Sequence, residues 1–165
     1  MSEDTRVLYR GEPLRRAAVK MMPKLAEDRF VQAVDIEEAA REAAADGIGQ
    51  LILFAEPGTL DDAGLDLPLA EITTEMGGTG DLAAEVTEGG TVRAAYGTWH
   101  AAATLHEVRP DSPYPRDLVG RCGRELCRRV ADRLEEIAGG AVAVQVVLLA
   151  PAAGRMVGMY GRLRR

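Results

Sequence analysis

The sequence predicts an α+β protein with an antiparallel or mixed sheet and helices packed on one face of that sheet. Two observations predict this class. Short apolar segments bounded by glycine and proline alternate with segments whose apolar residues recur at intervals of three and four. The chain has 165 residues, of which 47% are hydrophobic and 28% are charged, so it is long enough to bury one core. We therefore expect residues 1–165 to form a single α+β domain.

The N-terminal segment is predicted to begin with a strand followed by a helix. Residues 6–10 form a short strand pattern, and Pro13 stands where the first turn of a helix accepts proline. Apolar residues then recur at intervals of three and four over residues 14–22. Pro23 is expected to end or kink this helix, because proline removes a backbone donor and its ring clashes with the preceding turn.

A second helix is predicted at residues 36–46. Asp35 and Glu38 have the spacing of a capping box, which satisfies free backbone N–H groups at a helix start, and Gly47 supplies the stop. The segment before it, residues 30–34, fits either a strand or a helical turn, and its periodicity does not separate the two.

A buried strand, a long loop and another strand follow. Residues 50–55 (Gln-Leu-Ile-Leu-Phe-Ala) have the continuous apolar pattern of a buried strand. Residues 56–68 are rich in proline, glycine and aspartate, which indicates a connector or an active-site lid. Residues 69–76 are predicted to be a strand.

The centre of the chain predicts a β-meander at about 82–106. Residues 82–87 and 91–96 flank Glu-Gly-Gly, and a three-residue turn is the register that places apolar residues opposite one another on one surface. In that register Glu85 lies opposite Arg93 on the other surface. A third strand then extends to residue 106.

The C-terminal third is predicted to contain the strongest helix and two further strands. Residues 109–115 carry three prolines and form a rigid connection. Over residues 116–138 apolar residues recur at three and four, and two glycines end the helix. Residues 141–150 are a long buried strand, and residues 156–163 are a last one.

The rare residue types exclude several chemistries. There is no Asn, and the two serines, Ser2 and Ser112, stand in a terminus and a turn, so serine hydrolysis is nearly excluded. Cys122 and Cys127 lie about 140° apart around a helix, so they form neither a disulfide with each other nor a shared metal site. We expect no metal site, and the sequence indicates no particular cofactor.

The charge is unevenly distributed along the chain. Residues 1–109 hold 20 acidic and 10 basic residues, whereas residues 110–165 hold 6 acidic and 10 basic ones. The two parts are expected to neutralise each other within one protomer or between protomers of a homo-oligomer. The net charge of −6 on the whole chain disfavours nucleic-acid binding, because nucleic acids are polyanions.

The candidate site residues lie on the outer face of the predicted meander. His100 and Glu85 are the candidate catalytic proton carriers, since histidine exchanges protons near neutrality and the deduced register brings His100 near Glu85. Arg93 is the candidate for holding an anionic group, and His106 is a second candidate ligand-binding residue. If both histidines lay on one strand they would be roughly 20 Å apart and could not serve one site.

The leading functional hypothesis is a small-molecule enzyme or binding protein for an anionic metabolite, with its site on a sheet face or at a subunit boundary. The alternative is a non-catalytic homo-oligomeric assembly or interaction protein, and nucleic-acid binding comes third. We expect a cytoplasmic location with no membrane partner, because no apolar run reaches the roughly 18 residues of a membrane span and the N-terminus lacks a signal-peptide pattern.

Overall fold

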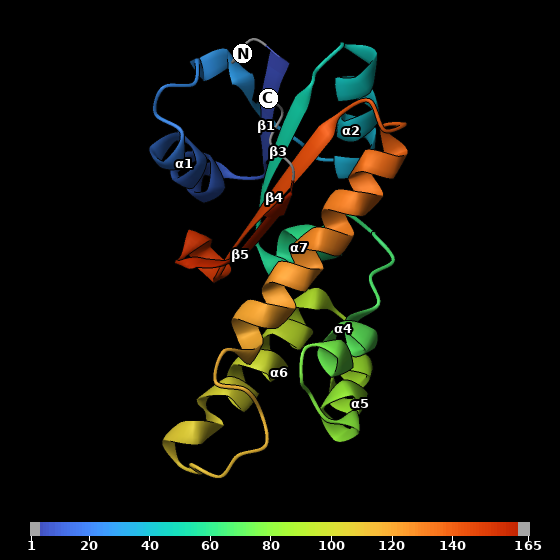
Figure 1. The fold of residues 1–165 in the computed structure, drawn as a ribbon. Helices are drawn as coiled ribbons and strands as arrows, with labels where there is room; N and C mark the ends of the chain where they lie inside the picture. The colour runs from blue at the N-terminus through green and yellow to red at the C-terminus, as the bar shows by residue number, and fades with distance from the viewer. Residues whose placement is uncertain (1–3, 162–165) are drawn as a thin grey trace.

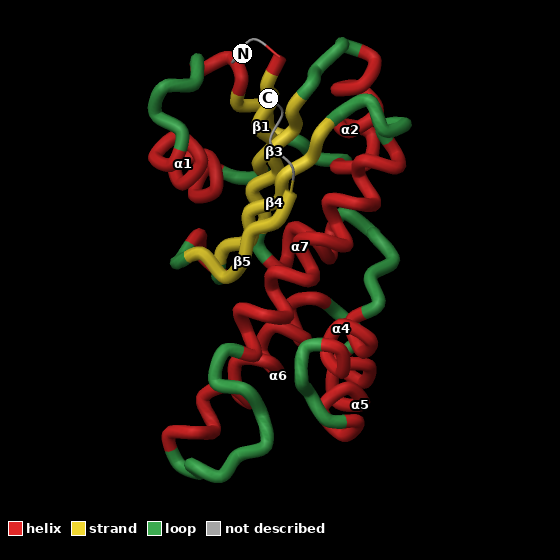
Figure 2. Tube along the Cα trace, in the orientation of Figure 1, coloured by secondary structure: helices red, strands yellow, loops and turns green. Residues whose placement is uncertain are grey.

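The computed structural model describes residues 4–161, and their fold is α+β, as the sequence predicts (Figure 2). The strands form one mixed sheet in the order β2-β1-β3-β4-β5. The pairings among β2, β1, β3 and β4 are parallel, and β5 is antiparallel to β4. The strands are β1 (Thr5–Tyr9), β2 (Phe30–Gln32), β3 (Gln50–Ala55), β4 (Ala143–Leu149) and β5 (Met156–Gly161).

Helices occupy the connections between the strands. One helix follows each of the first two strands, whereas the connection from β3 to β4 consists of five helices. Three of these, α4, α5 and α6, gather beyond one end of the sheet, and α7 runs from this group to the strands (Figure 1). The helices are α1 (Glu12–Met21), α2 (Ile36–Ala45), α3 (Pro57–Asp62), α4 (Leu69–Glu75), α5 (Gly80–Gly89), α6 (Val92–Thr104) and α7 (Leu118–Ile137).

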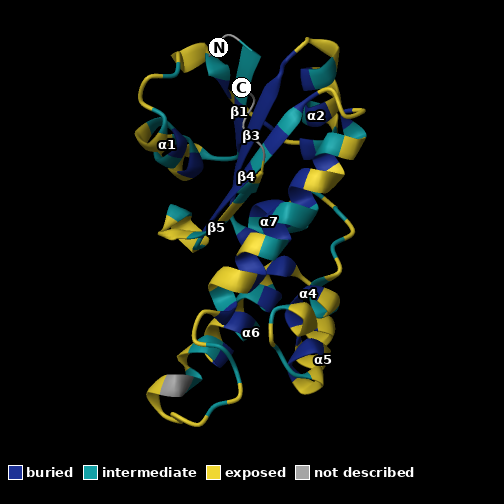
Figure 3. Ribbon diagram, viewed as in Figure 1, coloured by how far each residue is buried: buried dark blue, intermediate teal, exposed yellow. Residues whose placement is uncertain are grey.

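Helices cover both faces of the sheet, rather than one face as predicted. The larger core lies between one face and α2 and α7, and it continues into the group of α4, α5 and α6. On the other face, Leu14 and Ala18 of α1 pack against alternate residues of the central strands. All six residues of β3 are buried, because parallel strands covered on both faces need apolar side chains in both directions (Figure 3).

The structure contains two of the predicted helices, and it shows that the undecided segment contains a strand. The Asp35 side chain accepts a hydrogen bond from the Glu38 backbone N–H at 3.1 Å, which confirms the predicted start of α2. The segment at 30–34 contains a strand, β2, paired with β1. The long helix predicted at 116–138 is α7, whose buried residues recur at helical spacing. Of the strand predicted at 156–163, the last two positions lie outside the described residues.

The predicted central meander at about 82–106 is wrong, because this segment is helical. Thr79 and Thr91 are the N-caps of α5 and α6, and their hydroxyl oxygens accept hydrogen bonds from Leu82 N–H at 3.2 Å and Ala94 N–H at 3.0 Å. Gly90, in the left-handed conformation with φ of 77°, ends α5. The segment contains many alanines, which favour helices, and these caps decide between helix and strand.

Two neighbouring segments also contain helices where we predicted a loop and a strand. The predicted loop at 56–68 contains α3, and the predicted strand at 69–76 is α4. The outer meander face on which we placed the candidate site residues is therefore absent, and self-association stays a prediction. No helix among the described residues is both long and apolar enough to cross a membrane.

An ion-pair cluster joins α7 to α4. Glu125 accepts hydrogen bonds from Arg128 at 2.6 Å and from Arg129 at 2.7 Å, and its side chain is 11% exposed. Arg129 also donates to Glu71 at 3.2 Å and to Glu75 at 2.7 Å. The hydrogen bond from Arg128, followed by that from Arg129, holds the pKa of Glu125 below its ordinary value, although burial opposes this.

Glu125 should make the free energy of unfolding depend on pH in the acidic range. Because its pKa is lower in the folded chain, its contribution to the free energy of unfolding is complete above the unfolded pKa of about 4.3 and is lost as pH falls through the folded pKa. We expect Glu125→Gln to cost about 1 kcal/mol at pH 7 and much less at pH 3, measured by urea unfolding. Glu136→Gln, at an exposed pair, is the control and should change little at either pH. A cost of Glu125→Gln that is the same at both pH values would contradict the assignment.

Candidate functional site

The first candidate site lies where the parallel strands end. The carboxyl ends of β1, β3 and β4 share one edge of the sheet, and the chain turns to opposite sides of β1 when it forms β2 and then β3. Ligands of α/β sheets commonly bind outside this edge. At this end of the sheet α1 follows β1 in the chain. The segment 150–155, which connects β4 to β5, lies beside α1.

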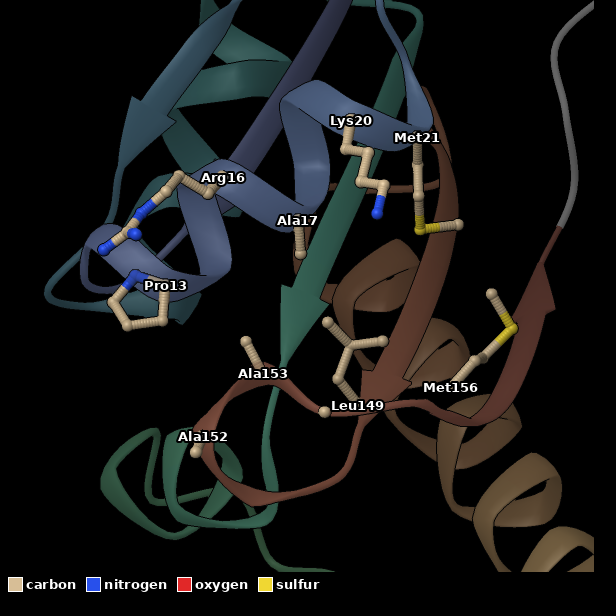
Figure 4. A pocket seen from close by; sticks show the side chains of 10 residues that line it. Pro13, Arg16, Ala17, Lys20, Met21, Leu149, Ala152, Ala153 and Met156 are labelled. Carbon is tan, nitrogen blue, oxygen red and sulfur yellow. The ribbon is translucent and has the colours of Figure 1, made fainter.

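A pocket of about 740 Å³ lies between α1 and this connection, and we call it the α1 pocket. Its volume falls within the range of small-molecule sites. Lys20 and Met21 extend from α1 toward the side of the pocket formed by Leu149 and Met156 (Figure 4). The pocket is lined by Pro13, Arg16, Ala17, Lys20, Met21, Leu149, Ala152, Ala153, Gly154 and Met156.

The periodicity of α1 produces this wall. Residues 13, 16, 17, 20 and 21 fall on one face of a helix with 3.6 residues per turn, and they are the α1 residues that line the pocket. Leu14 and Ala18 fall on the adjoining face and are buried against the sheet. One helix thus contributes both to the core and to a solvent-facing wall that carries apolar and basic side chains.

Both cations of the pocket are available to a ligand. Among the residues that the structure describes, the Lys20 ammonium makes no hydrogen bond or ion pair. Arg16 has Glu12 at 3.9 Å, and its side chain is 73% exposed. The chain as a whole has a net charge of −6, so this pocket offers positive charge on a predominantly negative molecule.

The connection that forms the far wall is held in an uncommon conformation. Ala152 and Ala153 have φ values of 63° and 51°, in the left-handed region that alanine rarely adopts. The Ala153 N–H donates a hydrogen bond to the carboxylate of Glu56, which follows β3. Residues in this region cost about 1–3 kcal/mol each and are often found at binding sites. Glu56 therefore links the end of β3 to the shape of the pocket.

The structure separates the four residues predicted to carry function. Glu85 is exposed on α5, and the Arg93 side chain at the start of α6 lies over Gly58 in α3. The predicted pairing of Glu85 with Arg93 across two strands is absent, because both segments are helices. His100 lines a different pocket, whereas the side chain of His106 lies outside the described residues. The functional roles assigned to these four residues stay predictions.

Sequence reasoning missed the residues of the α1 pocket. The apolar recurrence over 14–22 predicted the helix, and a signal for the pocket was present in Arg16 and Lys20, four residues apart beside that stripe. The facing residues 149–156 lie far away in the sequence. Their position could not be found without the order of the strands, which brings β4 and its connection next to α1.

The buried thiols take no part in either pocket. Burial raises the pKa of both Cys122 and Cys127 to about 12, so both remain protonated near neutral pH. Within residues 4–161, no cluster of three or more histidine, cysteine or carboxylate side chains is placed to bind a metal ion.

The chain is similar to part of several curated enzymes. It is 36% identical over 97% of its length to the cobalt-precorrin-5B C(1)-methyltransferase of Salinispora tropica. It is 35% identical over 99% of its length to the protein with that name in Salinispora arenicola, and 32% identical over 88% to the one in Rubrobacter xylanophilus. These relatives are named as enzymes that act on a small molecule.

The similarity covers less than half of each relative. The chain spans 42%, 43% and 37% of the lengths of these three proteins. No protein-family model matches the sequence, and no solved structure matches it. The chain therefore corresponds to a part of each of these longer proteins.

Proposed function

We propose that this chain binds a carboxylated macrocycle in the α1 pocket and acts in methyl transfer to a cobalt-precorrin. The observation that carries the proposal is the combination of apolar side chains with two available cations at the carboxyl end of the parallel strands. The similarity to cobalt-precorrin-5B C(1)-methyltransferases along nearly the whole chain supports the choice of ligand.

The chemistry of the pocket suits this ligand. A cobalt-precorrin has a broad ring system and several carboxylate side chains. Ala17, Met21, Leu149 and Met156 offer an apolar surface against which part of the ring system packs. Lys20 and Arg16 stand at the helix side of that surface, where each forms a charge-assisted hydrogen bond with a carboxylate of the macrocycle.

The contribution of these residues to methyl transfer is positional. The reaction forms a carbon–carbon bond between the macrocycle and the methyl group, and it breaks the bond between that methyl group and its donor. A macrocycle held by two cations and an apolar wall presents one ring carbon in a fixed orientation, which lowers the entropic part of the barrier. The connection held by Glu56 keeps the far wall in place.

Titration with uroporphyrin III, a stable carboxylated macrocycle, tests the proposal. We expect saturable binding that weakens with added salt, because the attraction is partly between charges. The double variant Arg16→Ala with Lys20→Ala should bind at least about tenfold more weakly, equivalent to about 1.4 kcal/mol. Lys24→Ala removes a neighbouring lysine that does not line the pocket, and this control should bind like the wild type.

Two results would contradict the proposal. One is an affinity of the double variant equal to that of the wild type, and the other is an equal loss in Lys24→Ala. The alternative function, a non-catalytic interaction protein, predicts no specific affinity for the macrocycle in the same titration. Methylation of cobalt-precorrin-5B by the chain, followed by mass spectrometry, then tests whether binding leads to transfer.

A further inference from the structure

Two methionine side chains in the α1 pocket are accessible rather than buried in the core. Met21, the last residue of α1, is 45% exposed, and Met156, the first residue of β5, is 42% exposed. One comes from the helix and the other from the facing wall (Figure 4). Methionine carries a thioether, which packs as an apolar group and also binds metal ions. Each side chain is therefore open to contact with a bound molecule.

The register of β5 directs Met156 toward the pocket. Met156 is the cross-strand partner of Leu149, the last residue of β4. Such partners carry their side chains on the same face of the sheet. Leu149 packs in the core on the side of α1, so Met156 also faces α1. The Ala150 N–H donates to the Arg155 carbonyl at 3.0 Å, which closes the connection directly before Met156. The backbone of Met156 thus has a defined position across the pocket from α1.

The thioethers are the neutral metal-binding side chains of this pocket. Among the described residues that line it, none is a histidine, a cysteine or a carboxylate. Arg16 and Lys20 are the cations that we assign to carboxylates of the macrocycle. A metal ion at the centre of a bound ring would therefore meet a methionine sulfur as its side-chain ligand.

A cobalt-precorrin brings a metal ion into this setting. Its ring nitrogens surround the cobalt and leave axial positions open on either side of the ring. Methionine fills such an axial position in cytochromes c, where the ring is haem. The carboxylates lie at the periphery of the ring, so pairing with Lys20 and Arg16 keeps one edge at α1 and directs the centre toward the facing wall. Met156 stands on that wall, whereas Met21 adjoins Lys20.

We propose that the sulfur atom of Met156 is an axial ligand of the cobalt in the bound macrocycle. This inference rests on the proposed function, because it takes the macrocycle site as given. The sulfur donates a lone pair to the metal, and neither the metal nor the thioether is oxidised or reduced. The ring is then held at its centre by Met156 as well as at its edge by Arg16 and Lys20, which fixes the orientation of the ring carbon that accepts the methyl group.

Anaerobic titration with cobalt(II) uroporphyrin III, compared with metal-free uroporphyrin III, tests this inference. We expect the wild type to bind the cobalt form at least about tenfold more tightly. Met156→Leu keeps the apolar wall and removes the sulfur, so it should bind the two forms equally. Met159→Leu is the matched control, at an exposed methionine of β5 that does not line the pocket, and it should keep the preference of the wild type.

Histidine variants give a spectroscopic readout of the same position. Imidazole is a common metal ligand, and a nitrogen ligand splits the electron paramagnetic resonance lines of low-spin cobalt(II), whereas a sulfur ligand does not. We expect nitrogen splitting in the complex of cobalt(II) uroporphyrin III with Met156→His. None is expected with Met21→His or with Met159→His.

The outcomes separate this inference from the proposed function. Binding of metal-free uroporphyrin III that weakens in the Arg16 and Lys20 double variant supports the macrocycle site independently of cobalt. The inference is overturned if the wild type does not prefer the cobalt form, if Met156→Leu keeps the preference, or if Met156→His shows no nitrogen splitting. A wild type that binds neither form would overturn the proposed function and this inference together.

Discussion

Replacing Trp99 with alanine should lower the free energy of unfolding by about 3–5 kcal/mol. Trp99 of α6 is 1% exposed and is among the largest fully buried side chains. Its indole N–H donates a hydrogen bond to the Thr73 hydroxyl at 2.8 Å, and that hydroxyl donates to the Leu69 carbonyl at 2.7 Å. The substitution removes both the packing of the ring and the link between α6 and α4.

The two parts of this effect can be separated with milder variants. Trp99→Phe keeps most of the ring and should cost about 1–2 kcal/mol, because it mainly removes the hydrogen bond. Thr73→Val leaves the buried indole N–H without its acceptor and should cost about 1–3 kcal/mol. In the Trp99→Phe background Thr73→Val should cost less, since the donor is already absent.

Urea unfolding followed by far-UV circular dichroism gives these values, because the variants of Trp99 lose the tryptophan signal. In the wild type, the fluorescence of Trp99 and the circular dichroism should change together if residues 1–165 unfold as the single domain that the sequence predicts. A loss below about 1 kcal/mol for Trp99→Ala would contradict the packing of this side chain.

Replacing Gly158 with alanine should cost about 3 kcal/mol. The added Cβ would lie 2.7 Å from the Arg124 backbone nitrogen and 2.8 Å from the Gly123 carbonyl carbon. Both are backbone atoms, so either β5 or α7 must move. A smaller loss is expected for Gly123→Ala, because its Cβ would lie 2.7 Å from a side-chain atom, Val157 Cγ1, but no closer than 3.3 Å to a backbone atom of β5, and because alanine favours the helix.

Gly97→Ala is the matched control for these glycine variants. Gly97 lies inside α6, and a Cβ there would meet nothing within 4 Å. Alanine should therefore stabilise the protein by about 0.5–1 kcal/mol, since glycine loses more backbone entropy in a helix. Thermal unfolding compares the three variants. A Gly158→Ala protein as stable as the wild type would show that α7 and β5 are not in close contact.

The parts of the fold that sequence predicted correctly carry strong local signals. The capped helix at α2, the continuous apolar strand at β3 and the long amphipathic helix at α7 each have a pattern that few other structures satisfy. The prediction of strands from the alternation of apolar residues is wrong at α5 and α6. There alanines are common, and the same residues fit either alternation or recurrence at three and four.

The sequence signals that predict helices at α5 and α6 are the capping residues rather than the pattern of apolar residues. Thr79 and Thr91 each precede a helix by one residue, and Gly90 separates the two helices. A hairpin interpretation uses the same glycine as its turn. Local sequence therefore left two structures open. The helical one is stabilised by the burial of Trp99 in the core and by its hydrogen bond to Thr73 of α4.

The sequence by itself determined the α+β class, most of the strands and the helix that carries Arg16 and Lys20. Only the tertiary structure decided which distant residues face that helix and which surround His100. The physical reason is that a binding pocket depends on contacts between segments far apart in the chain. The order of the strands places residues 149–156 beside α1, and the glycine contact between α7 and β5 places Arg155 near Arg116.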